Sequence, residues 1–198
     1  MTEQRSIDKN SPGRRRNDKS HKAILQAALE LLEQDGYRAL TIEAIAARAG
    51  VGKQTIYRWW PSKAAVVLEA FTANAAMQIP QPDTGSLRQD LQEFFASTLH
   101  AGGERTALVL RSLMAEALLD PEFADQFKHI FIYARRNALG EVLTRGVERG
   151  QLAADVDINF LLDLVYGVIW YRVLVQHAAL DEELMEQMVD MIMRYSKK

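Results

Sequence analysis

Residues 40–67 read LTIEAIAARAGVGKQTIYRWWPSKAAVV, and this stretch decides the fold. Thr41 is a typical N-cap for a short helix that Gly50 ends. A tight link leads into another helix over about residues 53–60, which Pro61 cannot continue. Two short helices joined by a tight glycine-containing turn predict a helix-turn-helix, whose second helix fits the major groove of DNA.

The helix over residues 53–60 has an apolar face and a polar face. At about 100° per residue, Ile56 and Trp60 share the face that we expect to be buried. The other positions carry hydrogen-bonding, cationic or aromatic side chains. Gln54 suits an adenine edge and Arg58 a guanine edge. The expected DNA contacts are Thr41, Lys53, Gln54, Thr55, Tyr57, Arg58, Trp59 and Lys63.

Read alone, GVGKQT looks similar to a phosphate-binding loop. The match fails because Ala47 stands where that motif has its first glycine and Gln54 stands where Ser or Thr binds magnesium. The segment also follows a helix instead of a strand. A solvated helix face is the remaining alternative to a DNA-reading face.

Charge is divided unevenly along the chain. Residues 1–63 hold 12 Lys and Arg against 7 Asp and Glu, a net charge of +5, whereas the rest hold 12 against 19, a net charge of −7. Only residues 1–63 therefore carry the net positive charge that favours binding to a polyanion. Residues 1–17 are polar and carry Arg14 to Arg16, which predicts a flexible basic arm with a weak phosphate role or no role. A helix follows from about Asp18 to Asp35, and Gly36 ends it.

These residues resemble the DNA-binding signature of the TetR/AcrR family of bacterial transcriptional regulators. The resemblance covers about fifty residues, and the matching positions are Thr41, Ile45, Ala46, Ala49, Gly50, Val51, Tyr57, Trp60, Ser62 and Lys63. The tryptophan pair is unusual at its place, so Trp59 can either reach a phosphate or shield the core. The resemblance implies a homodimeric, DNA-binding regulator, most often a repressor of a palindromic operator, which a small-molecule effector releases.

The rest of the chain is predicted to be helical as well. Pro80, Pro82 and Gly85 mark a linker, and Ser86 with Gln89 forms a capping-box pattern at the start of the next helix. The other start and stop signals are Gly102, Gly103, Asp120 with Pro121, Gly150, Asp157 and Asp181. One long helix is expected from Asp120 to near Gly150.

The fold class is therefore all-α, with an N-terminal three-helix DNA-binding domain and a C-terminal helical domain. The expected divisions are a basic arm over 1–17, the helix-turn-helix domain over 18–64, a connecting helix and linker over 65–85, and an effector-binding and dimerisation domain over 86–198.

The helix from about Ile158 to His177 is apolar on nearly every side, so it must be covered on nearly every side. A partner subunit is the expected cover, with packing inside one chain as the alternative. The expected interface residues are Phe160, Leu164, Gly167, Val168, Tyr171, Leu184, Met188 and Ile192.

The family resemblance also implies an effector pocket among the middle helices. Its expected lining residues are Phe94, Phe95, Arg111, Met114, Phe127, Phe131, Tyr166 and Trp170, with Glu116 and His129 as further polar anchors. Each of them is also a plausible core or surface residue.

Several function classes have little support. The chain has no cysteine, its four histidines show no metal-ligand spacing, and no catalytic motif is found, so no metal, cofactor or catalytic residue is expected. The N-terminus lacks a secretory signal, and Asp163 with Arg172 argues against a membrane span, so the cytoplasm is the expected location. A helical enzyme and a helical protein-interaction adaptor, neither of them binding DNA, remain the alternatives.

Overall fold

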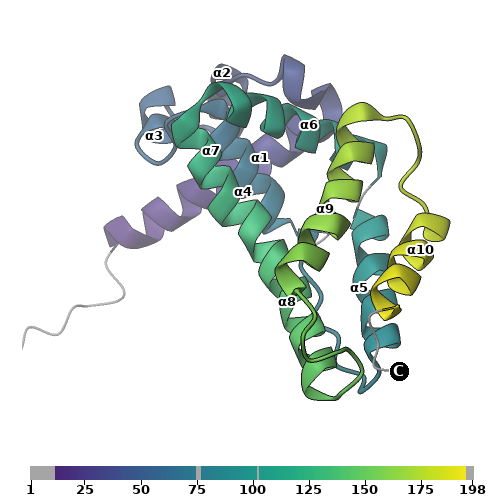
Figure 1. Cartoon of the computed structure of the whole chain (residues 1–198). Helices are drawn as coiled ribbons and strands as arrows, with labels where there is room; N and C mark the ends of the chain where they lie inside the picture. Colours follow the sequence, from purple (N-terminus) through teal and green to yellow (C-terminus); the bar gives the residue numbers. More distant parts are fainter. Residues whose placement is uncertain (1–11, 75–76, 102, 195–198) are drawn as a thin grey trace, which may run out of the picture. The chain divides into compact units, whose positions relative to one another are not determined.

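The computed structural model describes residues 12–74, 77–101 and 103–194, and every regular element within those ranges is a helix (Figure 1). The predicted all-α class is confirmed. The elements are α1 (Pro12–Ala39), α2 (Ile42–Ala49), α3 (Lys53–Tyr57), α4 (Lys63–Ala73), α5 (Leu87–Ala101), α6 (Glu104–Leu119), α7 (Pro121–Phe127), the π-helix η2 (Lys128–Ile132), α8 (Tyr133–Glu148), α9 (Ile158–Val175) and α10 (Glu182–Met193). Two compact units divide at residues 70 and 71, within α4.

In the first unit, local signals set the helix ends as the sequence predicts. The Thr41 hydroxyl accepts a hydrogen bond from the amide of Ala44, and Gly50 takes the left-handed conformation that ends α2. Gly36, with a φ of 74°, kinks α1, and regular helical turns continue beyond it. The backbone of α1 already starts at Pro12, before the expected start at Asp18, and residues 1–11 of the expected arm lie outside the described residues.

The helix α3 is shorter than predicted. It ends at Tyr57. Beyond it, the carbonyl of Ile56 accepts from the amide of Trp59 at 2.9 Å, with the spacing of a tighter 3₁₀ turn, and from the amide of Trp60 at 3.0 Å. The Ser62 hydroxyl then accepts from the amide of Ala65 at 3.2 Å and starts α4, as expected.

In the second unit, α5, α8, α9 and α10 enclose one apolar core. Figure 1 shows α10 beside α5 and α8 beside α9, and these pairs pack against each other. At Gly146 of α8 an added Cβ would lie only 2.8 Å from the side chain of Leu87, so the missing side chain permits the close approach of α5. The largest fully buried side chains of this core are Phe95, Leu87, Leu91, Leu139, Leu143 and Leu152.

The expected long helix from Asp120 to Gly150 is not one α-helix. Asp120 caps it by accepting from the amides of Glu122 and Phe123, as predicted. However, residues 128–132 form a π-helix, in which the amide of Tyr133 bonds to the carbonyl of Lys128 five residues earlier. A π turn adds a residue to the helical repeat and rotates the side chains that follow, and such turns are frequent at functional sites.

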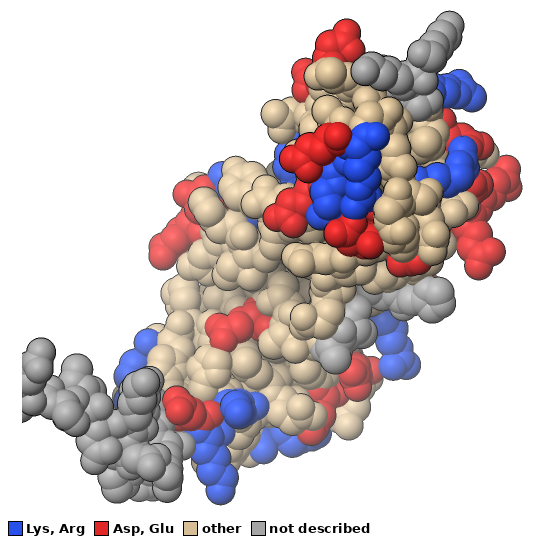
Figure 2. All heavy atoms as spheres, turned by 90° about the horizontal axis from the view of Figure 1, so that it is seen from below, with Lys and Arg blue, Asp and Glu red and all other residues tan. Residues whose placement is uncertain are grey.

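Ion pairs fasten the linker before α5 to the end of α8. Asp90 is fully buried and accepts from the amide and the hydroxyl of Thr84 at 2.7 Å and from Arg149 at 3.2 Å, while Arg149 also pairs with Asp83. Burial by itself raises the pKa of Asp90, but the hydrogen bonds from Thr84 and Arg149 outweigh it and hold the pKa below its usual value. In Figure 2, one group of Lys and Arg side chains in the upper centre of the view is bordered by Asp and Glu side chains.

Among the described helices, α9 is long and apolar enough to cross a membrane by length and composition alone. Two charged side chains lie within it. Asp163 is paired with Arg136 of α8 at 2.6 Å, and Arg172 donates to the carbonyl of Ala179. Leu161 and Val165, on one side of α9, are buried in the core of the unit. These contacts are those of a helix in a globular domain.

Candidate nucleic-acid interface and ligand cavity

The short helix α3 presents a polar face above two buried anchors. Ile56 is 0% exposed and Trp60 is 4% exposed, as the helical spacing predicts. Gln54, Tyr57 and Arg58 are exposed. The packing of the anchors fixes the helix, while the exposed side chains lie outside the core.

Lys53, Lys63 and Thr41 are among the expected DNA contacts whose side chains already have partners. Lys53 forms an exposed ion pair with Glu43 at 2.9 Å, and this side-chain hydrogen bond raises the pKa of Lys53 and lowers that of Glu43. Lys63 donates to the carbonyl of Tyr37 at 3.1 Å and lies 4.2 Å above the Tyr37 ring. Thr41 uses its oxygen as the N-cap and keeps its hydroxyl proton for another acceptor.

The two tryptophans have different roles. The indole N–H of Trp60 donates to Glu69 of α4 at 2.7 Å, and Glu69 also lies 3.0 Å from His21 of α1. Trp59 is half-buried and contacts the rings of His21 and Trp60 edge-on, at centroid distances of 5.2 and 5.4 Å. The guanidinium of Arg58 lies 5.3 Å above the Trp59 ring.

Trp59 therefore lies between the polar face of α3 and the cluster of His21, Trp60 and Glu69, in which Trp60 is the buried member. Sequence reasoning missed His21 and Glu69, which come from α1 and α4 and carry no local signal of their role.

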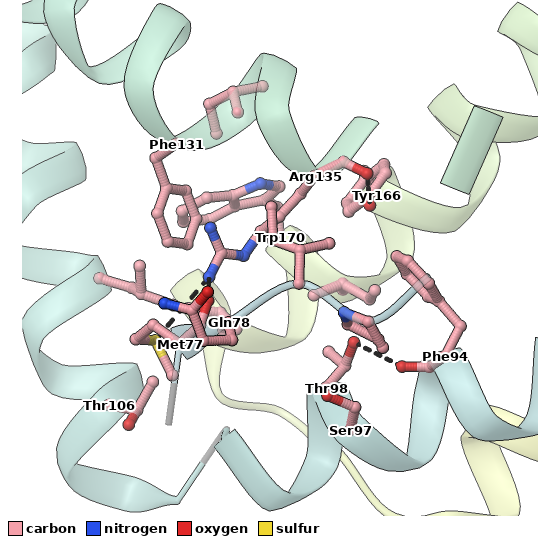
Figure 3. A pocket seen from close by; sticks show the side chains of 16 residues that line it. Met77, Gln78, Phe94, Ser97, Thr98, Thr106, Phe131, Arg135, Tyr166 and Trp170 are labelled. Carbon is pink, nitrogen blue, oxygen red and sulfur yellow. Dashed lines mark hydrogen bonds between the residues drawn. The ribbon is translucent and has the colours of Figure 1, made fainter. Parts of the chain in front are cut away.

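The second unit contains a cavity of about 100 Å³ beside α8 and α9 (Figure 3). Four of the eight expected pocket residues line it: Phe94, Phe131, Tyr166 and Trp170. The lining residues that the sequence did not single out include Met77, Gln78, Ser97, Thr98, Thr106 and Arg135. Most of the remaining lining side chains are aliphatic or aromatic, as in most sites for small organic molecules.

The other expected pocket residues lie elsewhere. Phe95 and Phe127 are buried in the core, and Phe127 stacks directly behind Phe131 at a centroid distance of 5.4 Å. Arg111 of α6 donates to the carbonyl of Val173 at 3.3 Å, and the half-buried Met114 is also absent from the cavity lining.

The two further polar anchors lie outside the cavity lining as well. Glu116 is half-buried on α6. His129 is exposed and has its Nδ1 atom 2.7 Å from the carbonyl oxygen of Asp125.

Arg135 is the cation of the cavity. Its guanidinium donates to the carbonyl of Met77 at 3.1 Å and lies 3.8 Å above the ring of Phe131, while the Tyr166 hydroxyl donates to the backbone carbonyl of Arg135 at 2.7 Å. Burial lowers the pKa of Arg135 to about 10, which leaves it charged at neutral pH. Burial also raises the pKa of Tyr166, so its hydroxyl stays protonated.

A ridge of apolar side chains runs along the outer face of α9. Five of its members are exposed, among them Phe160 at 53% and Tyr171 at 57%, and the half-buried Leu164 completes it. We define the α9 ridge as Phe160, Leu164, Val168, Tyr171, Leu174 and Val175; Gly167, which is exposed, lies among them. These positions recur every three or four residues, so they share one face of the helix.

The helix α10 directs its apolar side chains into its own chain and not onto the surface. Leu184, Met188 and Ile192 were expected at a subunit interface, but they are at most 5% exposed and pack in the core of their own chain. Their apolar stripe faces α5, so these three residues do not join the α9 ridge. Within the described ranges, no group of three His, Cys, Asp or Glu side chains could hold a metal ion.

Two family profiles match the chain. The one described as "Bacterial regulatory proteins, tetR family" matches residues 24–70, and the one described as "Tetracyclin repressor-like, C-terminal domain" matches residues 81–192. The first profile thus spans the unit with α3, and the second spans the part of the chain with the cavity and the α9 ridge.

Similar proteins extend over nearly the whole chain. The uncharacterized HTH-type transcriptional regulator YdeS of Bacillus subtilis is 36% identical over 89% of both chains. The DNA-binding transcriptional repressor TetR of Mycobacteroides abscessus is 28% identical over 85% of this chain and 88% of that protein. The crystal structure of the TetR family transcription regulator SCO0332 is 29% identical, with a TM-score of 0.79, and covers 91% of this chain and 100% of that one.

Proposed function

Because this chain belongs to the TetR family of bacterial regulatory proteins, and is therefore a DNA-binding transcriptional regulator, we propose that it represses transcription from a roughly palindromic operator. Two copies bind the operator together, and a small molecule in the cavity releases them. The repressor named in Mycobacteroides abscessus supports the direction of control. The protein acts in the cytoplasm, where the bacterial chromosome is found.

The observation that carries this proposal is the exposed face of α3. Gln54 and Arg58 are amide and guanidinium side chains that pair with the edges of adenine and guanine. Lys53, Tyr57 and Lys63 flank them and suit phosphate oxygens, which set the position of a protein on DNA but do not read its sequence. The ion pair between Lys53 and Glu43 is exposed, so a phosphate can replace the carboxylate at little cost.

The α9 ridge supports the homodimer. Six large apolar side chains along one helix face form a patch of the kind that soluble proteins cover with a partner. Because a two-fold interface uses the same patch on both copies, the ridge can pack against itself. Gly167 lies within this face and permits close contact between the two helices.

The cavity supports control by an effector. The recognition helices of a dimer must match half-sites about 34–36 Å apart, so a ligand that favours another dimer geometry weakens DNA binding. A coupling free energy of about 1 to 3 kcal/mol, typical of allosteric proteins, is enough for this release.

Membership of a family of regulators argues against the helical enzyme, and we propose no catalytic residue. It also argues against an adaptor without DNA binding, since such a protein would not need the exposed polar face of α3.

DNase footprinting on the DNA upstream of the protein's own gene tests the proposal. We expect protection of one short site with two inverted half-sites about one helical turn apart. Protection that spreads without preference along the fragment, or none at all, would contradict operator recognition by a dimer.

A further inference from the structure

The cavity contains a positive charge that no carboxylate among the described residues neutralises. Arg135 takes part in no ion pair with any carboxylate of the described residues. The neighbouring residue Arg136 differs, since it is paired with Asp163 at 2.6 Å. A charge in apolar surroundings costs free energy unless an opposite charge or several hydrogen bonds compensate it.

The partners that Arg135 does have hold it in place without cancelling its charge. The carbonyl of Met77 accepts one of its hydrogen bonds, and the ring of Phe131 lies against its face. In Figure 3 the guanidinium lies between Phe131 and Met77, among the lining side chains. A guanidinium has five N–H donors in one plane, so most of them remain available to a second acceptor.

The shape and polarity of the remaining walls restrict that acceptor. Trp170, Ile169 and Leu110 contribute apolar surface. The cavity volume of about 100 Å³ is of the same order as that of the engineered apolar cavity of about 150 Å³ that binds benzene. The site therefore suits a body no larger than one ring. A planar fork of N–H donors matches the two oxygens of a carboxylate.

We propose that the cavity binds a monocyclic carboxylic acid as its anion, with the carboxylate paired to Arg135 and the ring placed against Phe131 and Trp170. The role of this acid as an effector rests on the proposed repressor function, but its binding does not. A neutral compound of the same shape leaves the guanidinium without a counter-charge, so it binds more weakly.

Isothermal titration calorimetry on the full-length protein at pH 7.5 tests this assignment with benzoate and phenylacetate against their amides, benzamide and phenylacetamide. We expect each acid to bind at least tenfold more tightly than its amide. Arg135→Met should abolish this preference, and Arg135→Lys should keep part of it, which separates loss of charge from loss of folding. Arg136→Met is the matched control and should keep the full preference.

Equal binding of acid and amide, no binding of either acid up to 10 mM (about the limit of weak specific binding), or an unchanged preference in Arg135→Met would overturn the assignment. A gel-shift assay on the same samples keeps the two proposals apart. Acid binding without operator binding would refute the repressor and leave the ligand class standing. Operator binding without acid binding would refute the ligand class and leave the repressor standing.

Discussion

On α3 and at its C-cap, the polar side chains of Gln54 and Arg58 are exposed above two buried anchors, whereas in the second unit the cation of Arg135 lies among apolar walls. In the first arrangement, the residues that we propose to contact DNA differ from the residues that pack in the core. In the second, Phe131 and Arg135 help to build the domain and also line the cavity that we propose as a ligand site.

This difference has a thermodynamic consequence. Substitutions on the exposed face of α3 should change DNA affinity and leave stability nearly intact, because surface side chains contribute little to folding. Substitutions of buried anchors, or of buried charges in the second unit, should lower the free energy of unfolding directly. The two main substitutions that follow are ordered by that expected loss, and each is accompanied by its control.

Trp60→Ala should have the largest effect. It removes a side chain that is 4% exposed together with the hydrogen bond to Glu69, and we expect a loss of about 4 kcal/mol in the free energy of unfolding. Urea denaturation followed by circular dichroism measures it.

Trp59→Ala is the matched control for Trp60→Ala. Its half-buried ring makes edge contacts with His21 and Trp60 and has the guanidinium of Arg58 above it. We therefore expect a loss of about 1 kcal/mol in the free energy of unfolding. Equal losses in the two variants would show that Trp60 is no more an anchor than its neighbour.

Asp90→Ala should destabilise the second unit by about 3 kcal/mol, since it leaves Arg149 and the Thr84 donors without their buried acceptor. The lowered pKa of Asp90 also links it to pH. Its stabilising effect is present above the pKa of the unfolded chain, about 3.9, and is lost as the pH falls through the lower folded value.

Denaturation of wild type and Asp90→Ala between pH 2 and 7 checks both the size of the loss and its pH dependence. The free energies of unfolding of the two proteins should differ near pH 7 and converge in acid. Glu186→Gln, which breaks an exposed pair with Arg88, should change little at any pH. Parallel curves for wild type and Asp90→Ala would argue against the titration of Asp90.

Local chemistry made much of the fold predictable. Thr41, Asp120, Asp157 and Asp181 accept hydrogen bonds from amides two or three residues ahead, so each cap depends only on adjacent sequence. The burial of Ile56 and Trp60 followed from helical spacing for the same reason.

The cavity depends on distant contacts and was predicted only in part. Nothing in the neighbouring sequence distinguishes Arg135, which points into the cavity, from Arg136, which pairs with Asp163. The π turn at residues 128–132 rotates the side chains that follow it, which regular helical spacing does not predict.

The apolar stripe of α10 also shows that sequence periodicity predicts burial but not the burying partner. Periodicity showed that Leu184 and Met188 are covered, but it does not reveal whether the cover is the same chain or a second copy. The described core supplies the cover from α5.

The most direct test of the central claim is the operator affinity of the double variant Gln54→Ala, Arg58→Ala, measured by fluorescence anisotropy on the footprinted fragment. Each base contact contributes about 1 to 3 kcal/mol, so we predict a loss of at least tenfold, with the free energy of unfolding lowered by no more than about 1 kcal/mol. Arg105→Ala, an exposed arginine of α6, should bind as wild type does. Wild-type affinity in the double variant would contradict the account, because α3 would then not read DNA.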